Sequence, residues 1–137
     1  MSKTEIVSVF NKQFAEYLKL MTMLFPDDTD IKSTETSLLA LRKVNPRIII
    51  QIWYKYITLK YREQIYADNL DYFVTKNYAD DLNDTDNAKF ILRKIEVLRA
   101  PISKLNSENK EKTLVFLKNL TNLSDIYCKN NKTVSLS

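Results

Sequence analysis

The chain has 137 residues and contains no glycine. Glycine is the residue that most readily adopts positive φ, and the tight hairpin turns of antiparallel sheets depend on such positions. Helix ends can use asparagine instead, and this chain is rich in asparagine. We therefore expect an all-α fold. An AT-rich coding sequence would produce a similar bias toward Asn, Lys, Ile and Tyr, so the composition has two explanations.

The missing residue types also exclude most catalytic motifs. Without glycine there is no P-loop, no dinucleotide fingerprint and no G-x-S-x-G elbow. The chain has no histidine, which removes the Ser-His-Asp triad, the Cys-His pair and histidine metal ligands. Its single cysteine, Cys128, cannot form a zinc knuckle or a disulfide framework. We predict a protein that is not an enzyme, with no catalytic residues, metal, cofactor or small-molecule substrate.

Apolar periodicity predicts a series of helices. The clearest runs from Glu5 to Phe25, with a capping box of Ser2 and Glu5 before it and Pro26 after it. A second helix is expected over Ile31–Val44, and a third over Pro46–Leu59 with Asn45 as its N-cap. The isoleucines of the third segment would also suit a buried strand, but no partner strand is evident. Further helices are expected over residues 61–67, 70–75, 86–100 and 108–127, with a break at Asp68 and Asn69. Asn106 or Ser107 is the expected N-cap of the last of them.

These helices are expected to form one compact bundle of about five to seven helices. We expect a single helical domain over residues 1–128 and a frayed tail over residues 129–137, which lack periodicity. The predicted core consists of large apolar side chains on the inward stripes: Phe10, Phe14, Tyr17, Met21, Leu38, Leu41, Ile49, Trp53, Tyr56, Phe73, Phe90, Ile95, Leu98, Phe116, Leu120 and Leu123.

Charge is distributed in blocks of alternating sign. Residues 41–62 carry six basic residues and no acid, residues 63–88 have a net charge of −6, and residues 89–118 have a net charge of +5. A block of one sign on a folded surface favours a partner of the opposite sign. The acidic block either folds against its basic neighbours within the chain or meets a basic face of another subunit, and the basic face alternatively meets nucleic acid.

Basic residues interleaved with aromatics mark the candidate binding surface. On the third helix, Arg47, Tyr54 and Lys55 are expected to point outward together, on a polar arc that also holds Gln51 and Thr58. Arg42 and Lys43 are further candidates just before this helix, whereas Trp53 and Tyr56 fall on the apolar arc. Lys89 and Arg93, with Arg99 nearby, form a second stripe. A solvated helix face is the alternative interpretation of both groups.

No run of the sequence is apolar over the ~18 residues that a membrane span needs. The N-terminal segment is amphipathic and charged, unlike a signal peptide. We therefore expect no membrane span and no secretion, with Cys128 reduced.

Five segments carry a resemblance to a known family, and two of them are Ile52-Trp-Tyr54 and the stretch from Tyr72 to Asp81. The other three are the more distinctive. They are Phe10-Asn-Lys-Gln-Phe14, the motif FPDDxDI that ends at Ile31, and the motif RKxNPR that ends at Arg47. Residues 10–82 resemble a family of short helical proteins encoded by giant nucleocytoplasmic DNA viruses of the mimivirus and phycodnavirus groups. The resemblance implies a viral protein of the host cytoplasm, in the viral factory, or of the virion, and offers no catalytic residues to carry over.

Taken together, these features predict a non-enzymatic interaction protein. The favoured function is a viral structural or assembly component that binds other proteins, viral ones or copies of itself, through charged helical faces. The alternative is a nucleic-acid-associated protein of the viral factory or virion that uses a basic helix face.

Overall fold

The computed structural model describes the backbone of residues 2–75 and 86–136, and the side chains of residues 2–72 and 89–129. Over these ranges the chain is helical and has no strand, which confirms the all-α prediction and excludes a strand at the isoleucines. The elements are α1 (Lys3–Leu24), α2 (Thr29–Val44), α3 (Ile48–Trp53), the π-helix η1 (Tyr54–Thr58), α4 (Leu59–Tyr66), α5 (Leu70–Thr75), α6 (Asp86–Arg99), the 3₁₀-helix η3 (Ala100–Lys104) and α7 (Ser107–Leu136).

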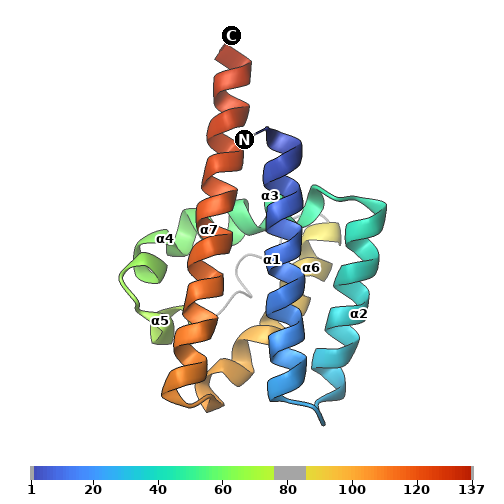
Figure 1. Ribbon diagram of the computed structural model, residues 1–137, viewed down its shortest axis with the longest axis vertical. Helices are drawn as coiled ribbons and strands as arrows, with labels where there is room; N and C mark the ends of the chain where they lie inside the picture. Colours follow the sequence, from blue (N-terminus) through green and yellow to red (C-terminus); the bar gives the residue numbers. More distant parts are fainter. Residues whose placement is uncertain (1, 76–85, 137) are drawn as a thin grey trace.

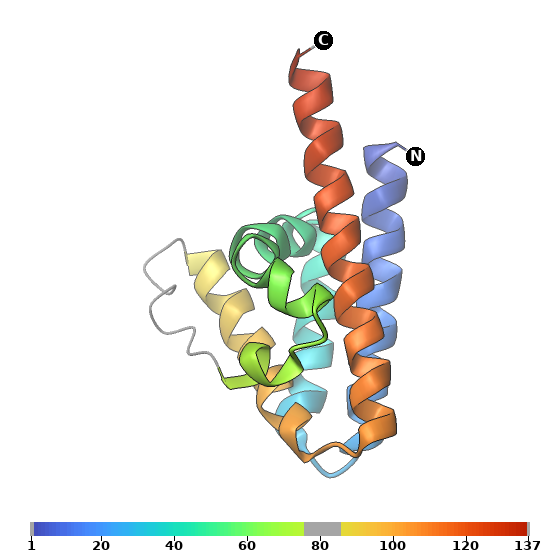
Figure 2. The ribbon, with the colours of Figure 1, turned by 90° about the vertical axis from the view of Figure 1, so that its left-hand side faces the viewer.

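The two longest helices form one side of the bundle. α1 and α7 lie antiparallel and side by side, and α2 packs on the other flank of α1 (Figure 1). The continuous segment α3–η1–α4 crosses behind them, and α6 lies beyond that segment (Figure 2). The last turns of α7 extend past the start of α1 (Figures 1 and 2). Among the described residues, no helix is both long enough and apolar enough to cross a membrane.

Capping explains several helix ends. The predicted capping box is present: the Glu5 N–H donates to Ser2 Oγ at 3.2 Å, and the Ser2 N–H donates to Glu5 Oε1 at 3.5 Å. The predicted cap of α7 is also present, because Asn106 Oδ1 accepts the Asn109 N–H at 2.9 Å. The break expected at Asp68 falls where α4 ends, and Asp68 has φ of 63°. Aspartate tolerates this left-handed conformation better than most residues.

The start of the third helix differs from the prediction. α3 begins at Ile48 and not at Pro46. Asn45 ends α2, with its N–H donating to the Leu41 carbonyl at 2.9 Å. Its side-chain Oδ1 accepts the Arg47 N–H at 3.3 Å, so Asn45 and Pro46 form a turn between α2 and α3. Asn45 therefore stabilises the turn and is not the N-cap of α3. Arg47 occupies the N-cap position and forms no side-chain hydrogen bond there.

The π-helix η1 overturns part of the predicted outward face. Thr58, expected on the polar face with Arg47 and Lys55, is fully buried. A π turn contains one more residue than the α-helical repeat allows, so every later side chain is rotated by about 100° from its expected position. Tyr56, on the predicted apolar arc, is buried as expected, so the α-helical wheel fails at Thr58.

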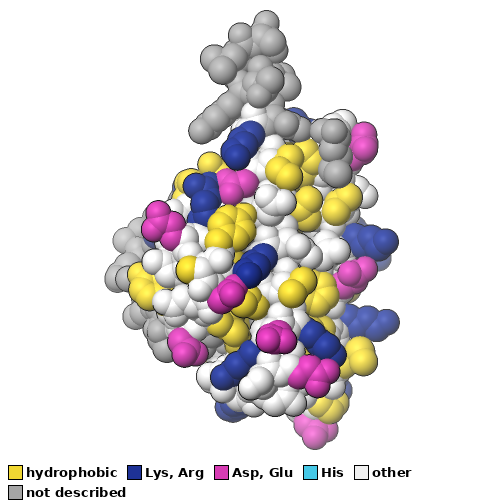
Figure 3. Space-filling view, turned by 60° about the vertical axis from the view of Figure 1, so that its left-hand side comes forward, with side chains coloured by type: hydrophobic (Ala, Val, Ile, Leu, Met, Phe, Trp, Pro, Cys, Tyr) yellow, Lys and Arg dark blue, Asp and Glu magenta, His cyan; other side chains and the backbone are white. Residues whose placement is uncertain are grey.

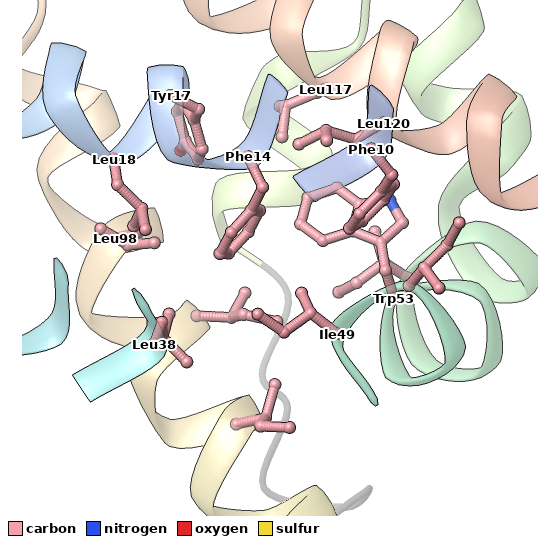
Figure 4. Close-up of a cluster of buried hydrophobic side chains, with 14 of the residues drawn as sticks. Phe10, Phe14, Tyr17, Leu18, Leu38, Ile49, Trp53, Leu98, Leu117 and Leu120 are labelled. Atoms are coloured by element: carbon pink, nitrogen blue, oxygen red, sulfur yellow. The ribbon is translucent and has the colours of Figure 1, made fainter. Parts of the chain in front are cut away.

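The core is largely the one predicted, and Trp53 is buried in it beside Phe10 (Figure 4). The Trp53 ring meets Phe10 and Phe14 edge-on, with centroid distances of 6.2 and 6.1 Å. Burial of each such side chain contributes ~1.5–3 kcal/mol, most of it offset by chain entropy. The confirmed buried residues are Phe10, Phe14, Tyr17, Met21, Leu38, Ile49, Trp53, Tyr56, Ile95, Leu98 and Leu120.

Four predicted core residues differ in burial, and one lies outside the description. Phe90 is 41% exposed, so its assignment to the core is wrong. The buried stripe of α6 runs instead through Ile91, Leu92, Ile95 and Leu98, and Phe90 carries the Lys94 ammonium 5.5 Å from its ring centroid. Leu41, Phe116 and Leu123 are only partly buried against the core. The Phe73 side chain lies outside the described residues.

A row of buried and partly buried polar contacts joins the α3–η1–α4 segment to α7; we call it the polar seam. Trp53 Nε1 donates to Thr121 Oγ1 at 3.3 Å, and Gln51 Nε2 donates to the Tyr127 hydroxyl at 3.3 Å. The hydroxyls of Thr58 and Ser124 are 2.6 Å apart. Because the Ser124 proton goes to the Thr121 carbonyl at 2.8 Å, Thr58 is the donor of that pair.

An ion pair closes the polar seam. Arg62 Nε donates to Asp125 Oδ2 at 3.0 Å, and a guanidinium NH₂ group contacts the other carboxylate oxygen. Asp125 is buried, so this two-point contact offsets the loss of its hydration. The seam favours one register of α7 against the crossing segment, since each polar side chain on the segment has a matching polar side chain on α7.

The far end of α7 departs from the expected boundary. The periodic stripe predicts a helix end at Tyr127, whereas the backbone of α7 continues to Leu136. The side chains of residues 130–137 lie outside the described residues. The fraying of residues 129–137 stays a prediction.

Candidate binding surface

The structure divides the predicted binding residues into two groups. Arg42 and Lys43 end α2, and Arg47 follows in the turn before α3, so these three lie at one junction. Tyr54 and Lys55 lie on η1, and Lys89 and Arg93 lie on α6. Tyr56 packs on Leu92, which makes η1 and α6 neighbours.

In the first group, Arg42 has a structural contact. Its guanidinium donates to the backbone carbonyl of Asn11 on α1 at 3.1 Å. The Asn11 side chain in turn donates to the Pro46 carbonyl at 2.8 Å. These two bonds tie the middle of α1 to the α2–α3 junction. Lys43 and Arg47 are exposed, as predicted.

In the second group, two predicted residues have neighbours within the continuous α3–η1–α4 segment. The Lys55 ammonium lies 5.2 Å from the centroid of the Tyr56 ring. Tyr54 is half-buried and lies close enough to Arg62 of α4 to affect its charge. Asp125 is the main cause, with Tyr54 a minor one, of the raised pKa of the Arg62 guanidinium. Arg99 does not belong to this exposed stripe, because it is buried and contacts Glu96 at 2.5 Å.

Beside the first group lies an open groove of about 600 Å³, which we call the α1 groove. Val7 and Asn11 are almost fully buried and form its floor. The lining along α1 also includes three small side chains, which leave the groove open: Thr4, Ser8 and Ala15. Arg42 and Pro46 form the wall on the side of α2.

The exposed edge of the α1 groove carries charge. Lys12, Glu16 and Lys19 line it, one turn apart along α1. Neither lysine forms an ion pair with an acid among the described residues. With Arg42 on the opposite wall, the lining holds three basic residues and one acid, a net charge of +2.

The sequence prediction missed this site. Lys12, Glu16 and Lys19 lie opposite the apolar stripe of α1, where a solvated face is the default. The groove depends on Arg42 and Pro46 meeting α1 from residues more than 30 positions away. A local signal is the run of small residues at Thr4, Ser8 and Ala15, but such residues are common on exposed helix faces.

The acidic block is only partly described. Asp68 pairs with Lys118 of α7. The side chains of residues 73–88 lie outside the described residues, so the expected meeting of this block with a basic face stays a prediction. On the face over α7 and its neighbours, acidic and basic side chains are interspersed rather than segregated (Figure 3).

The tyrosines with shifted pKa values lie outside the α1 groove. Burial raises the pKa of the Tyr17, Tyr61 and Tyr66 phenols, which keeps them neutral well above physiological pH. None of the three lines the α1 groove. Within residues 2–72 and 89–129, no three Asp, Glu or Cys side chains gather closely enough to hold a metal ion. The groove itself offers shape, apolar surface and charge.

Comparisons of the chain with protein-family models, with curated proteins and with solved structures find no match.

Proposed function

We propose that the chain is a non-enzymatic interaction protein that binds other proteins through its charged helical faces. The observation that carries this proposal is the α1 groove, with its buried floor and basic edges. Protein-binding sites combine these features, because buried apolar surface supplies affinity and charge at the rim orients the partner. The resemblance of residues 10–82 to helical proteins of giant DNA viruses supports a structural or assembly role in the viral factory or the virion.

A second candidate function is nucleic-acid association. It is favoured by the exposed Lys43 and Arg47 at one junction and the exposed Arg93 on α6. Binding through phosphate contacts releases counterions, so its affinity falls steeply and linearly on a log–log plot against salt. If the chain retains DNA or RNA only weakly at low salt, and this affinity does not fall linearly on that plot, protein binding is the better explanation.

A photo-crosslinking experiment tests the first proposal. A photoreactive amino acid replaces Ser8 in the α1 groove, and a matched variant carries it at Asn122, an exposed position of α7. We expect a discrete protein adduct from position 8 in cells or virions that contain the chain. Treatment with nuclease leaves this adduct unchanged.

Further variants carry the photoreactive amino acid at positions 43, 47 and 93, in the two basic groups. The proposal fails if neither these positions nor position 8 give a protein adduct. It also fails if every adduct disappears on nuclease treatment, because the second candidate function then explains the capture. An adduct from position 122 alone places the interface on α7 and contradicts the assignment to the groove.

A further inference from the structure

We propose that the α1 groove takes an amphipathic α-helix of a partner protein whose carboxylates lie seven residues apart. This inference rests on the proposed function and names the chemistry of the partner. It follows from three properties of the groove: its length, its hydrogen-bonding groups and the spacing of its charges.

The length of the groove suits a helix. Its lining runs along α1 from Thr4 to Lys19, a distance of roughly 22 Å at 1.5 Å per residue. That is the length of a helix of about four turns. Ser8 and Ala15 are small, so a second helix axis can approach to the ~8–10 Å typical of packed helices.

The hydrogen-bonding groups of the groove disfavour an extended peptide. An extended segment needs partners for its backbone N–H and C=O groups. The floor is the side of α1, whose backbone groups are already bonded within the helix. The Asn11 Nδ2 is used by Pro46, and Asn11 Oδ1 is buried without a donor among the described residues. A helix satisfies its own backbone and fits such a wall.

The charges along the edge set a pattern. Lys12 and Lys19 are seven residues apart, which places them on one line of α1 about 10 Å apart. Glu16 lies between them, so a partner acid at that level meets a like charge. A helix with carboxylates at positions i and i+7 on one edge, and none between them, matches both lysines and avoids Glu16.

The same charges argue against a second copy of this chain in the groove. Each copy brings a lining of net charge +2, and the exposed Lys43 and Arg47 lie beside it. Two such faces repel one another at low salt. An acidic partner is attracted by all of these residues.

Two synthetic peptides of about 18 residues and identical composition test the inference. Both are helical, with Ala and Leu on one face. One carries glutamates seven residues apart beside that face, and the other carries the same glutamates on the opposite face. The full chain is titrated into each labelled peptide, and binding is followed by fluorescence anisotropy at about 50 mM salt, where charges are weakly screened.

Matched chain variants locate the contact. Lys12→Glu with Lys19→Glu reverses the edge of the groove. Lys32→Glu with Lys104→Glu is the control, since both of these lysines are exposed and neither lines the groove. Each pair lowers the net charge by four, from +4 to 0. We expect the first pair to weaken binding of the first peptide at least 10-fold and the control pair to change it less than 3-fold.

Three outcomes overturn the inference. Equal binding of the two peptides shows that only total charge matters. Equal effects of the two variant pairs show that the groove is not the contact. No binding of the first peptide shows that this partner chemistry is wrong, while a protein adduct from position 8 would still support the proposed function. Concentration-dependent dimers by analytical ultracentrifugation that are lost in the first variant pair instead assign the groove to a second copy.

Discussion

Replacement of Trp53 by alanine tests the account of the core. Trp53 is 1% exposed and is the only tryptophan of the chain. It contacts Phe10 and Phe14 edge-on and donates to Thr121 across the polar seam. Truncation of a buried tryptophan to alanine costs ~3–5 kcal/mol through lost transfer energy and the cavity left behind. We expect Trp53→Ala to lose that amount of unfolding free energy.

The loss converts to a shift in melting temperature. The unfolding entropy is about 2.1 cal/mol/K per residue, or roughly 0.29 kcal/mol/K for 137 residues. A loss of 3–5 kcal/mol therefore lowers Tm by roughly 10–17 °C. Urea and thermal unfolding followed by far-UV circular dichroism measure both quantities without relying on tryptophan fluorescence.

Two controls accompany this variant. Trp53→Phe keeps most of the ring and loses the indole N–H, so we expect a smaller loss of about 1–2 kcal/mol. Val44→Ala changes an 84% exposed side chain and should stay within about 0.5 kcal/mol of the parent. A loss below about 1.5 kcal/mol for Trp53→Ala would refute the placement of this ring in the core.

Three further predictions concern the polar seam and pH. Ser124→Ala leaves the buried Thr58 hydroxyl without its acceptor and should cost about 1–3 kcal/mol, whereas adding Thr58→Val should recover most of that loss; denaturant unfolding of both variants checks this. Arg62→Ala leaves the buried Asp125 carboxylate without its ion-pair partner and should cost about 1–3 kcal/mol of unfolding free energy. The value is lower than for a fully buried pair because Arg62 is partly exposed. A double-mutant cycle with Asp125→Asn measures the coupling, and a coupling energy of zero would contradict this contact. Burial raises the pKa of Tyr17 above its usual 10.0, so the unfolded chain loses this proton at a lower pH than the folded chain does. The contribution of this phenol to stability is therefore complete below pH 10 and falls as the pH rises above that value. Tyr17→Phe should flatten that decline in urea midpoints measured across the alkaline range, and an unchanged slope would show that this phenol does not contribute.

Local periodicity was sufficient to predict the helices and most of the core. The stripe of Ile6, Phe10, Phe14, Tyr17 and Met21 on α1 is buried as its spacing indicates. The capping box before α1 and the asparagine cap of α7 are also where their local patterns place them. These features depend on residues within one or two turns, which a sequence displays directly.

Other features depend on contacts between distant segments, and the sequence pattern missed them. The extra residue of η1 rotates Thr58 into the core, and no local pattern marks that insertion. The polar seam requires Thr58 and Arg62 to meet Ser124 and Asp125, more than 60 residues away. The periodicity of α6 predicts Phe90 on the inward stripe, but the buried stripe of this helix, which packs against α2 and α3, begins one residue later.

The candidate binding residues show the same limit. Arg42 is predicted to belong to a basic binding face, and the sequence does not indicate that it bonds to Asn11 and forms one wall of the α1 groove. The sequence pattern indicates only that Lys12 and Lys19 lie opposite the apolar stripe of α1. Their relation to Arg42 appears only when α2 is placed beside α1.

The central claim is that the α1 groove is a surface for an acidic helix of another protein. Its most direct test is a nuclear magnetic resonance titration of the isotopically labelled full chain with the peptide whose glutamates lie seven residues apart. We predict that amide shift changes concentrate on residues 4–19 and 42–47, and that they are absent with the peptide whose glutamates lie on the opposite face. Shift changes centred on η1 and α6, around Lys55, Lys89 and Arg93, would contradict the claim and move the binding surface to the second basic group.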